Sequence, residues 1–239
     1  MTNPSTTTAA SPAAVVVSNE ARPLLLSMLR SQAYRELAAV QLLEQALTFM
    51  PHEEHARLRH QQHEEGAHLE AALTLWQSVA GASRQALVDT ARARLQEKPL
   101  PLVRTPLDVA MAQFVFDRAG YFVLREYVSG SFAPYAQIAA AIVAEEEGHQ
   151  DDGARTLIPL AHAQPREAQA SFEVWFATSL LSFGRPGSDG DKLAVALGLK
   201  RRGAGAVMQE YVESLRPGLQ AAGLRFPTRS PAAAGPLRL

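Results

Sequence analysis

Two segments of the sequence repeat the same arrangement of a glutamate and a histidine. The first is HEEGAH, which contains Glu65 and His68, and the second is EEEGH, which contains Glu146 and His149. Residues three positions apart lie on one face of a helix, so each segment would present a carboxylate beside an imidazole. Carboxylate and imidazole groups are common ligands of divalent first-row metals. The repeat therefore indicates that each segment supplies half of a metal site.

Each motif also has an acidic partner at the position that a helical hairpin would place opposite it. In an antiparallel hairpin, the position numbers of facing residues add to a constant that the turn sets. The proline turn after the first helix places Glu36 opposite Glu65, and the Gly-Ser turn of the second hairpin places Asp117 opposite Glu146. In both pairs, 29 residues separate the two partners. The register therefore predicts that four carboxylates and two histidines converge.

Glu36 and Asp117 each interrupt an apolar stripe on their helix. A lone buried carboxylate is costly or becomes protonated, and several together repel one another. Two divalent cations would balance four carboxylates, and oxygen ligands with imidazole and without sulfur favour iron or manganese over copper or structural zinc. We therefore predict a two-metal site whose catalytic and metal-binding residues are Glu36, Glu65, His68, Asp117, Glu146 and His149.

Each part of this pattern has a simpler interpretation when it is taken alone. Glu65 and His68 could lie on a solvated helix face. Asp117 could be a buried cap, or it could form an ion pair with Arg118 or Arg125. The joint pattern favours the metal site, because both hairpin registers and both acidic partners must agree.

Other acidic and histidine residues fit the pattern less well. Glu126 lies half a turn round the helix from Asp117, so we expect it to pair with a base on the outer face, and Glu44 fails the register test against Glu65. A stripe of histidines is expected to be solvated, although one of them could shape iron uptake: His52, His55, His60 and His63. Three more glutamates are expected to be exposed or to support the ligands: Glu64, Glu145 and Glu147.

The elements that must position these residues are all helical, because the apolar spacing is helical and alternation with a period of two is almost absent. Two similar hairpins indicate an all-α, up-down bundle of four long helices. The expected helices run from about Glu20 to Thr48, Pro51 to Val79, Ser83 to Glu97, Thr105 to Ser129, Pro134 to Ala161 and Pro165 to Phe183, with one or two more between Lys192 and Ala222.

Composition excludes several other kinds of site. The net charge of −1 gives no electrostatic case for a nucleic-acid or anionic-membrane partner. The chain has no cysteine, which excludes disulfides, thiolate zinc sites, iron–sulfur clusters and cysteine nucleophiles. No apolar run is long enough to span a membrane. We expect disordered tails at 1–19 and 227–239, no signal peptide, one helical domain over 20–226 and a cytoplasmic location.

Around these residues the sequence resembles the phenylacetic acid catabolic branch of the ferritin-like di-iron proteins, and in particular the catalytic subunits of ring-1,2-phenylacetyl-CoA epoxidases. The similarity runs from about Ser31 to Thr228. It includes SQAYRE around Glu36, HEEGAHLE, FVFDRAG around Asp117, SGSFAPYAQIAAAIVAEEEGHQDDG and LLSFGRPGSD.

The resemblance implies a ferritin-like four-helix bundle with additional C-terminal helices. It implies a non-haem centre of two iron ions, or of manganese and iron, held by the same six residues. The implied activity is that of an O₂-dependent monooxygenase, which inserts one oxygen atom into an aromatic acyl-CoA or a related small substrate. The implied partners are a separate reductase and a ligand-free sister subunit or a second copy of the chain.

The sequence also departs from this family. Leu43 and Gln61 stand where family members carry an acid–lysine bridge, so access to the metals is expected to differ. Three basic residues are candidates for phosphate contact or a solvated patch: Lys200, Arg201 and Arg202. A ferroxidase or iron-binding protein is an alternative, disfavoured by the helices after Phe183. A tRNA-nucleoside hydroxylase is another, disfavoured by the charge balance, and the complete ligand set disfavours a non-catalytic accessory subunit.

Overall fold

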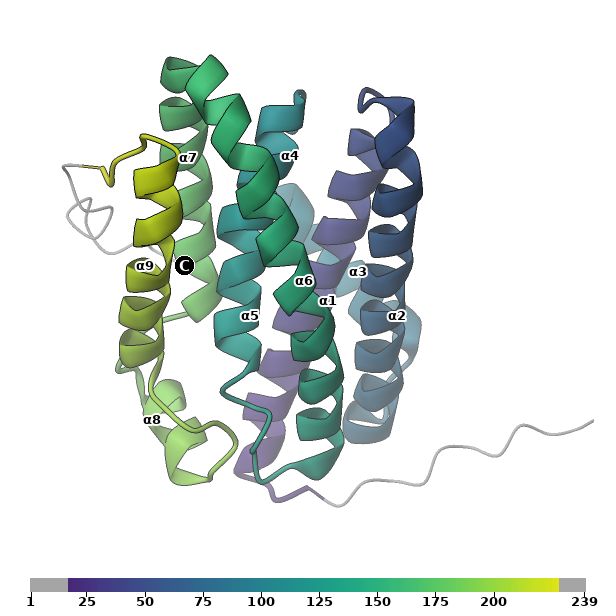
Figure 1. Ribbon diagram of the computed structural model, residues 1–239. Coiled ribbons are helices and arrows are strands. Elements are labelled where there is room, and N and C mark those ends of the chain that lie inside the picture. The colour runs from purple at the N-terminus through teal and green to yellow at the C-terminus, as the bar shows by residue number, and fades with distance from the viewer. Residues whose placement is uncertain (1–16, 228–239) are drawn as a thin grey trace, which may run out of the picture.

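The computed structural model describes residues 17–227, and the described part of the chain is helical with no β-strand. This confirms the predicted all-α class. Four long helical segments stand side by side (Figure 1). They are α1 (Ala21–Ala46), α2 (His55–Ala80), a composite of α4 (Pro106–Ala112), η2 (Gln113–Asp117) and α5 (Arg118–Leu124), and α6 (Ala133–Ala163).

The remaining elements connect or flank this bundle. A crossover that contains α3 carries the chain back along the bundle, so that α2 and the composite segment run in the same direction (Figure 1). One such long crossover is a property of ferritin-like bundles. The flanking elements are η1 (His52–Glu54), α3 (Arg84–Glu97), α7 (Pro165–Leu180), η3 (Leu181–Phe183), α8 (Asp189–Ala196) and α9 (Ala204–Ala221).

Helix boundaries follow local sequence signals. The Thr105 hydroxyl accepts a hydrogen bond from the backbone N–H of Asp108, and the Asp108 carboxylate accepts one from the backbone N–H of Thr105, so α4 begins with a capping box. Gly81 ends α2 with a φ of 65°, which only glycine adopts without strain. Ser83 caps α3 by accepting from the Ala86 N–H. These signals fix where the crossover leaves and rejoins the bundle.

The third long helix differs from the continuous helix predicted over Thr105–Ser129. It contains a π-helical turn, Gln113–Asp117, and it ends at Leu124, after which the chain turns. The π turn lies against α6 at Gly153, where an added Cβ would come within 2.7 Å of the Phe114 backbone nitrogen. Single π-helical turns inside α-helices are frequent at functional sites. The turn ends at Asp117.

The core consists of two apolar clusters separated along the bundle. On α1 one cluster contains Leu25 and Leu29, and the other contains Leu42 and Leu43. On α6 the same clusters contain Ile142 and Leu157 respectively. Buried polar residues occupy the layer between them, which includes the middle of each long helix: Gln32, Glu36, Gln61, Glu65, His68, Gln113 and Glu146.

The ends of the chain were predicted to be disordered tails, and no segment was predicted to span a membrane. The tails predicted at 1–19 and 227–239 lie almost entirely outside the described residues; of the described ones, Val17 packs partly buried against the cluster that contains Leu25. None of the helices in the described range combines the length and apolar character that crossing a bilayer requires.

Candidate metal centre

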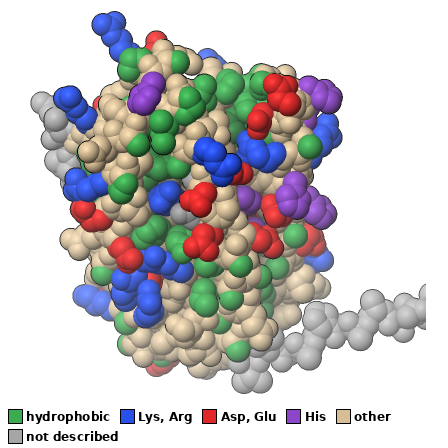
Figure 2. Space-filling view, viewed as in Figure 1, with side chains coloured by type: hydrophobic (Ala, Val, Ile, Leu, Met, Phe, Trp, Pro, Cys, Tyr) green, Lys and Arg blue, Asp and Glu red, His purple; other side chains and the backbone are tan. Residues whose placement is uncertain are grey.

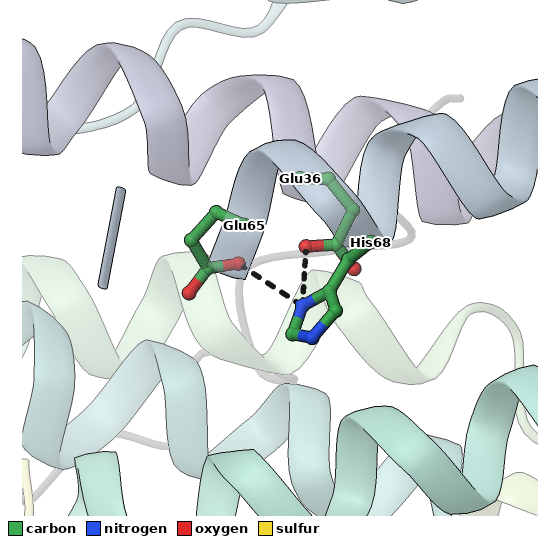
Figure 3. Close-up of side chains that lie close together, drawn as sticks. All are labelled: Glu36, Glu65 and His68. Carbon is green, nitrogen blue, oxygen red and sulfur yellow. Dashed lines mark ion pairs between the residues drawn. The ribbon is translucent and has the colours of Figure 1, made fainter. Parts of the chain in front are cut away.

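Glu36 of α1 and two residues of α2, Glu65 and His68, form a first group in the polar layer. Figure 3 shows both carboxylates pointing toward the imidazole. His68 Nδ1 lies 3.7 Å from Glu36 Oε2 and 3.7 Å from Glu65 Oε2. All three side chains are buried. The first predicted hairpin register is thereby confirmed, because it placed Glu36 opposite Glu65.

A second group combines α2 with α6 and shares Glu65 with the first. His149 Nδ1 lies 3.7 Å from Glu65 Oε1 and 3.5 Å from Glu146 Oε2. In each group the potential ligand atoms all lie within 4.8 Å of one another. Glu65 therefore directs one oxygen toward each histidine, as a carboxylate that bridges two cations would.

Asp117 is next to these groups but belongs to neither of them. Its carboxyl lines the same small cavity as Glu65, between α1, α2 and η2. Burial and the negative charge of Glu146 raise its pKa well above the usual value, whereas His149 opposes this shift. The structure thus places all six predicted residues in one region, with five in two compact groups and Asp117 at their edge.

The outward nitrogens of both histidines contact carboxylates on the opposite helix. His68 Nε2 lies 2.7 Å from Glu145 Oε2, and His149 Nε2 lies 3.1 Å from Glu64 Oε2. From the sequence, these glutamates were predicted to be exposed or to support the ligands, but their partners were not assigned. The sequence does contain a signal for this pairing, because each Glu-x-x-His motif is directly preceded by another glutamate.

Glu36 is held by a polar network that the sequence analysis missed. The Gln32 amide, fully buried on the same helix, donates to Glu36 Oε1, and Gln32 Oε1 accepts from Arg35 and, at 3.3 Å, from the Tyr135 hydroxyl. Gln32 precedes Glu36 by one helical turn, so a glutamine on the apolar stripe could have indicated this role. The network orients Glu36 toward His68.

The positions that depart from the family pattern lie beside the same cavity. Leu43 and Gln61 both line it, and the Gln113 amide donates to Gln61 Oε1 at 2.6 Å. An uncharged amide pair between α2 and η2 therefore stands beside Glu65. Apart from Glu65 and Asp117, the residues that line this cavity are neutral.

Crowding of carboxylates shifts the pKa values of Glu65 and of both histidines. Burial, followed by the charges of Glu146 and Glu36, raises the pKa of Glu65 well above its usual value. Although burial opposes it, contacts with carboxylates raise the pKa of His68 and of His149 to about 9. The cluster must take up positive charge near neutral pH, either as protons or as bound cations.

The donor set fits two divalent ions. The Nδ1 atoms of His68 and His149 are buried, and among the described residues they have no hydrogen-bond partner, although both face carboxylate oxygens. An unsatisfied buried nitrogen is costly, and a metal ion would satisfy it. Oxygen and imidazole donors without sulfur match iron or manganese. Glu36 and His68 would hold one ion, Glu146 and His149 the other, and Glu65 would lie between them.

The alternative ligands lie elsewhere. Glu44 is exposed. Glu126 pairs with bases, Arg201 and Arg202, as expected, but it is buried at 2% exposure, so its predicted position on an outer face is wrong. The helix has ended before Glu126, and α9 and its preceding loop cover that position.

All three basic candidates for phosphate contact pair with carboxylates, although the Arg201 side chain, which pairs with Glu126, is 56% exposed. Lys200 pairs with Asp191 and is mostly buried, and Arg202 bridges Glu126 and Glu210. Of the histidine stripe, His55 is partly buried and three members are exposed, namely His52, His60 and His63.

Two comparisons with known proteins bear on the chain. No curated protein matched it. A family model described as phenylacetic acid catabolic protein matches residues 16–236, a range that includes all six predicted ligands and both helical hairpins. The chain therefore belongs to the phenylacetic acid catabolic protein family.

Proposed function

We propose that the protein is an O₂-dependent non-haem di-iron monooxygenase that inserts one oxygen atom into an aromatic acyl-CoA or a related small substrate. One observation supports this proposal above the others. Glu65 lies between His68, which is buried, and His149, which is partly buried, and it directs a different oxygen toward each. Within the described residues, both facing Nδ1 atoms lack hydrogen-bond partners. Family membership supports a role in phenylacetate-type catabolism.

Two ions bound in this layer would supply the redox chemistry by which O₂ is reduced and one of its atoms is transferred. The chain's own residues would hold the centre in place. Glu145 and Glu64 accept hydrogen bonds from the Nε2 atoms of His68 and His149, which leaves each Nδ1 directed inward. Such outer carboxylates fix the tautomer of a ligating histidine and increase its basicity.

The small cavity beside Glu65 and Asp117 is the side on which we place the reacting substrate. Leu42, Leu43 and Phe116 contribute apolar surface there, and Gln61 contributes its paired amide. Apart from Glu65 and Asp117 these walls are neutral, which suits an uncharged ring better than a charged group and limits the water that would compete with the substrate. The cavity is small, so side chains that line it must move to admit a ring.

Electrons would come from a separate reductase, because the chain has no cysteine with which to hold an iron–sulfur cluster. The proposal also includes a sister subunit or a second copy as a partner, and a cytoplasmic location. We propose two iron ions, with a mixed manganese–iron centre as the alternative, because both metals accept these oxygen and imidazole ligands.

An isotope experiment tests the activity. Protein loaded anaerobically with Fe²⁺ would be mixed with a reductant, phenylacetyl-CoA or a related aryl acyl-CoA, and ¹⁸O₂. We expect a product that carries one ¹⁸O atom, and we expect none from the Glu65→Ala variant. A product without the label would contradict the proposal. Repeated Fe²⁺ oxidation with mineral formation and no organic product would favour a ferroxidase.

A further inference from the structure

The candidate centre is mostly buried, and His149 is the most exposed of the five residues that form its two groups. The side chains of Glu36, Glu65, His68 and Glu146 are between 2% and 8% exposed, whereas that of His149 is 12% exposed. A metal ion that entered through either apolar cluster would lose its water ligands, and apolar side chains offer no ligands to replace them. The side of His149 is therefore the favourable place to search for a route of metal uptake.

A continuous series of ligand atoms leads outward from His149. Its Nε2 lies 3.1 Å from Glu64 Oε2, and the other oxygen of Glu64 lies 3.3 Å from His60 Nε2. The side chain of His60 is 74% exposed, and that of Glu64 is 21% exposed. Imidazole and carboxylate groups thus extend from open solvent to a candidate ligand, with no apolar residue between them.

We propose that His60 and Glu64 form a transit site that captures divalent metal ions from solvent and passes them inward to the centre beside His149. This inference rests on the proposed metal centre and adds its route of loading. His60 and Glu64 are four residues apart and so lie on one helix face, where they can bind the same ion. Two ligands hold a divalent ion loosely, as transit requires, and rotation of the Glu64 carboxylate can transfer the ion inward.

Surface charge at this face supports capture of a cation. Figure 2 shows histidine and acidic side chains gathered together over the region of α2. Glu145 and Glu147, on the exposed side of α6, add negative charge near the same face. Local negative potential raises the concentration of cations and their rate of association.

Glu145 offers a less complete route. Its side chain is 43% exposed and contacts His68 directly. Within the described residues, however, the ion pairs give Glu145 no second partner toward solvent, whereas Glu64 is paired with His60. The route through His60 therefore provides two ligands at the surface, and the route through Glu145 provides one.

His63 is a matched control for His60. Both are exposed histidines on α2. His63 directly precedes Glu64, so its side chain leaves the helix about 100° away from that of Glu64 and cannot share an ion with it. Replacing either histidine by alanine removes one imidazole from the same surface, but only His60→Ala removes a member of the proposed pair.

The test is the rate at which metal-free full-length protein takes up Co²⁺, followed by stopped-flow visible absorbance. We expect uptake by His60→Ala to be about tenfold slower than that of the unmodified protein, because it loses surface capture. The final absorbance should be the same, because the ligands in the centre are unchanged. His63→Ala should take up Co²⁺ at the unmodified rate.

Three other outcomes of the Co²⁺ experiment would contradict the transit site, and a fourth would contradict the metal centre itself. Equal rates for the unmodified protein and His60→Ala would overturn the transit site, and so would equal slowing in both histidine variants. A lower final absorbance in His60→Ala would show that His60 helps to retain the ions, which also contradicts a transit role. If the unmodified protein takes up no Co²⁺, the metal centre itself fails, and the route fails with it.

Discussion

Glu65 of α2 and His149 of α6 face each other across the bundle, with 3.7 Å between Glu65 Oε1 and His149 Nδ1. The other oxygen of Glu65 lies at the same distance from His68 Nδ1. One carboxylate therefore connects the two groups. This arrangement needs both helical hairpins, because α6 belongs to the second and α2 to the first.

The supporting carboxylates should affect metal affinity without supplying ligands. Glu145→Ala and Glu64→Ala remove the groups that accept from the Nε2 atoms of His68 and His149. We expect each to lower metal affinity about 10- to 100-fold, as is typical when such a partner of a ligating histidine is lost. Competition with a chromophoric chelator measures this.

The matched control is Glu147→Ala, which removes a neighbouring exposed carboxylate from the same helix. Its affinity should stay close to that of the unmodified protein. An equal loss of affinity in all three variants would indicate a general effect of surface charge, and it would contradict the specific role of Glu64 and Glu145.

Gly153 should be required for the position of the π turn. An alanine Cβ there would lie 2.7 Å from the Phe114 nitrogen and 2.8 Å from Gln113 Cβ, so α6 and η2 must separate. Overpacking of this kind costs about 1–3 kcal/mol. Urea unfolding should show Gly153→Ala to be destabilised by that amount, with weaker metal binding because Asp117 ends the displaced turn.

Gly148→Ala provides the comparison on the same helix. An added Cβ at Gly148 meets nothing within 4 Å. Alanine is the better helix former, so this variant should be as stable as the unmodified protein or more stable by about 0.5–1 kcal/mol. Equal unfolding free energies for the two alanine variants would contradict the close packing of α6 on η2.

Much of the fold could be predicted from the sequence, because helical periodicity and the signals at Thr105-Pro106, Gly81 and Pro51 are local. The π turn could not, since it packs closely against Gly153, which lies far along the chain. The end of the third helix at Leu124 was missed for a similar reason. The loop before α9 pairs with Glu126 there, and no local signal reports that contact.

The candidate site was predictable to the extent that register and periodicity determine it. Hairpin symmetry placed Glu36 beside Glu65 and His68, as observed. It did not reveal that Asp117 lies outside the compact groups, because Asp117 ends a π turn and the register argument assumed a regular α-helix. The buried Gln32 and the pairing of Glu145 with His68 depend on side-chain orientation between helices, which spacing alone does not specify.

Acid should reveal the contribution of the buried Glu126. Although burial opposes it, hydrogen bonds from Arg202 and Arg201 hold the pKa of Glu126 below its usual 4.5. A lowered pKa means that the ionised pair stabilises the fold fully above the unfolded value and loses this effect as pH falls through the folded one. Glu126→Gln should therefore cost about 1–3 kcal/mol at pH 7 and less below about pH 4.

Urea unfolding of the unmodified protein and Glu126→Gln at both pH values checks this. Glu213→Gln serves as the control, because Glu213 forms an exposed pair with Arg216. It should change stability little at either pH. A free-energy difference for Glu126→Gln that is independent of pH would contradict the role of the ionised carboxylate.

The central claim is that Glu65 connects two cation sites, and the most direct test is the metal content of anaerobically loaded protein. The donor set predicts about two divalent ions per chain, and Glu65→Ala should lose both because Glu65 belongs to both groups. Glu44→Ala, which removes an exposed glutamate of α1, should retain them. Full metal content in Glu65→Ala, or none in the unmodified protein, would contradict the account.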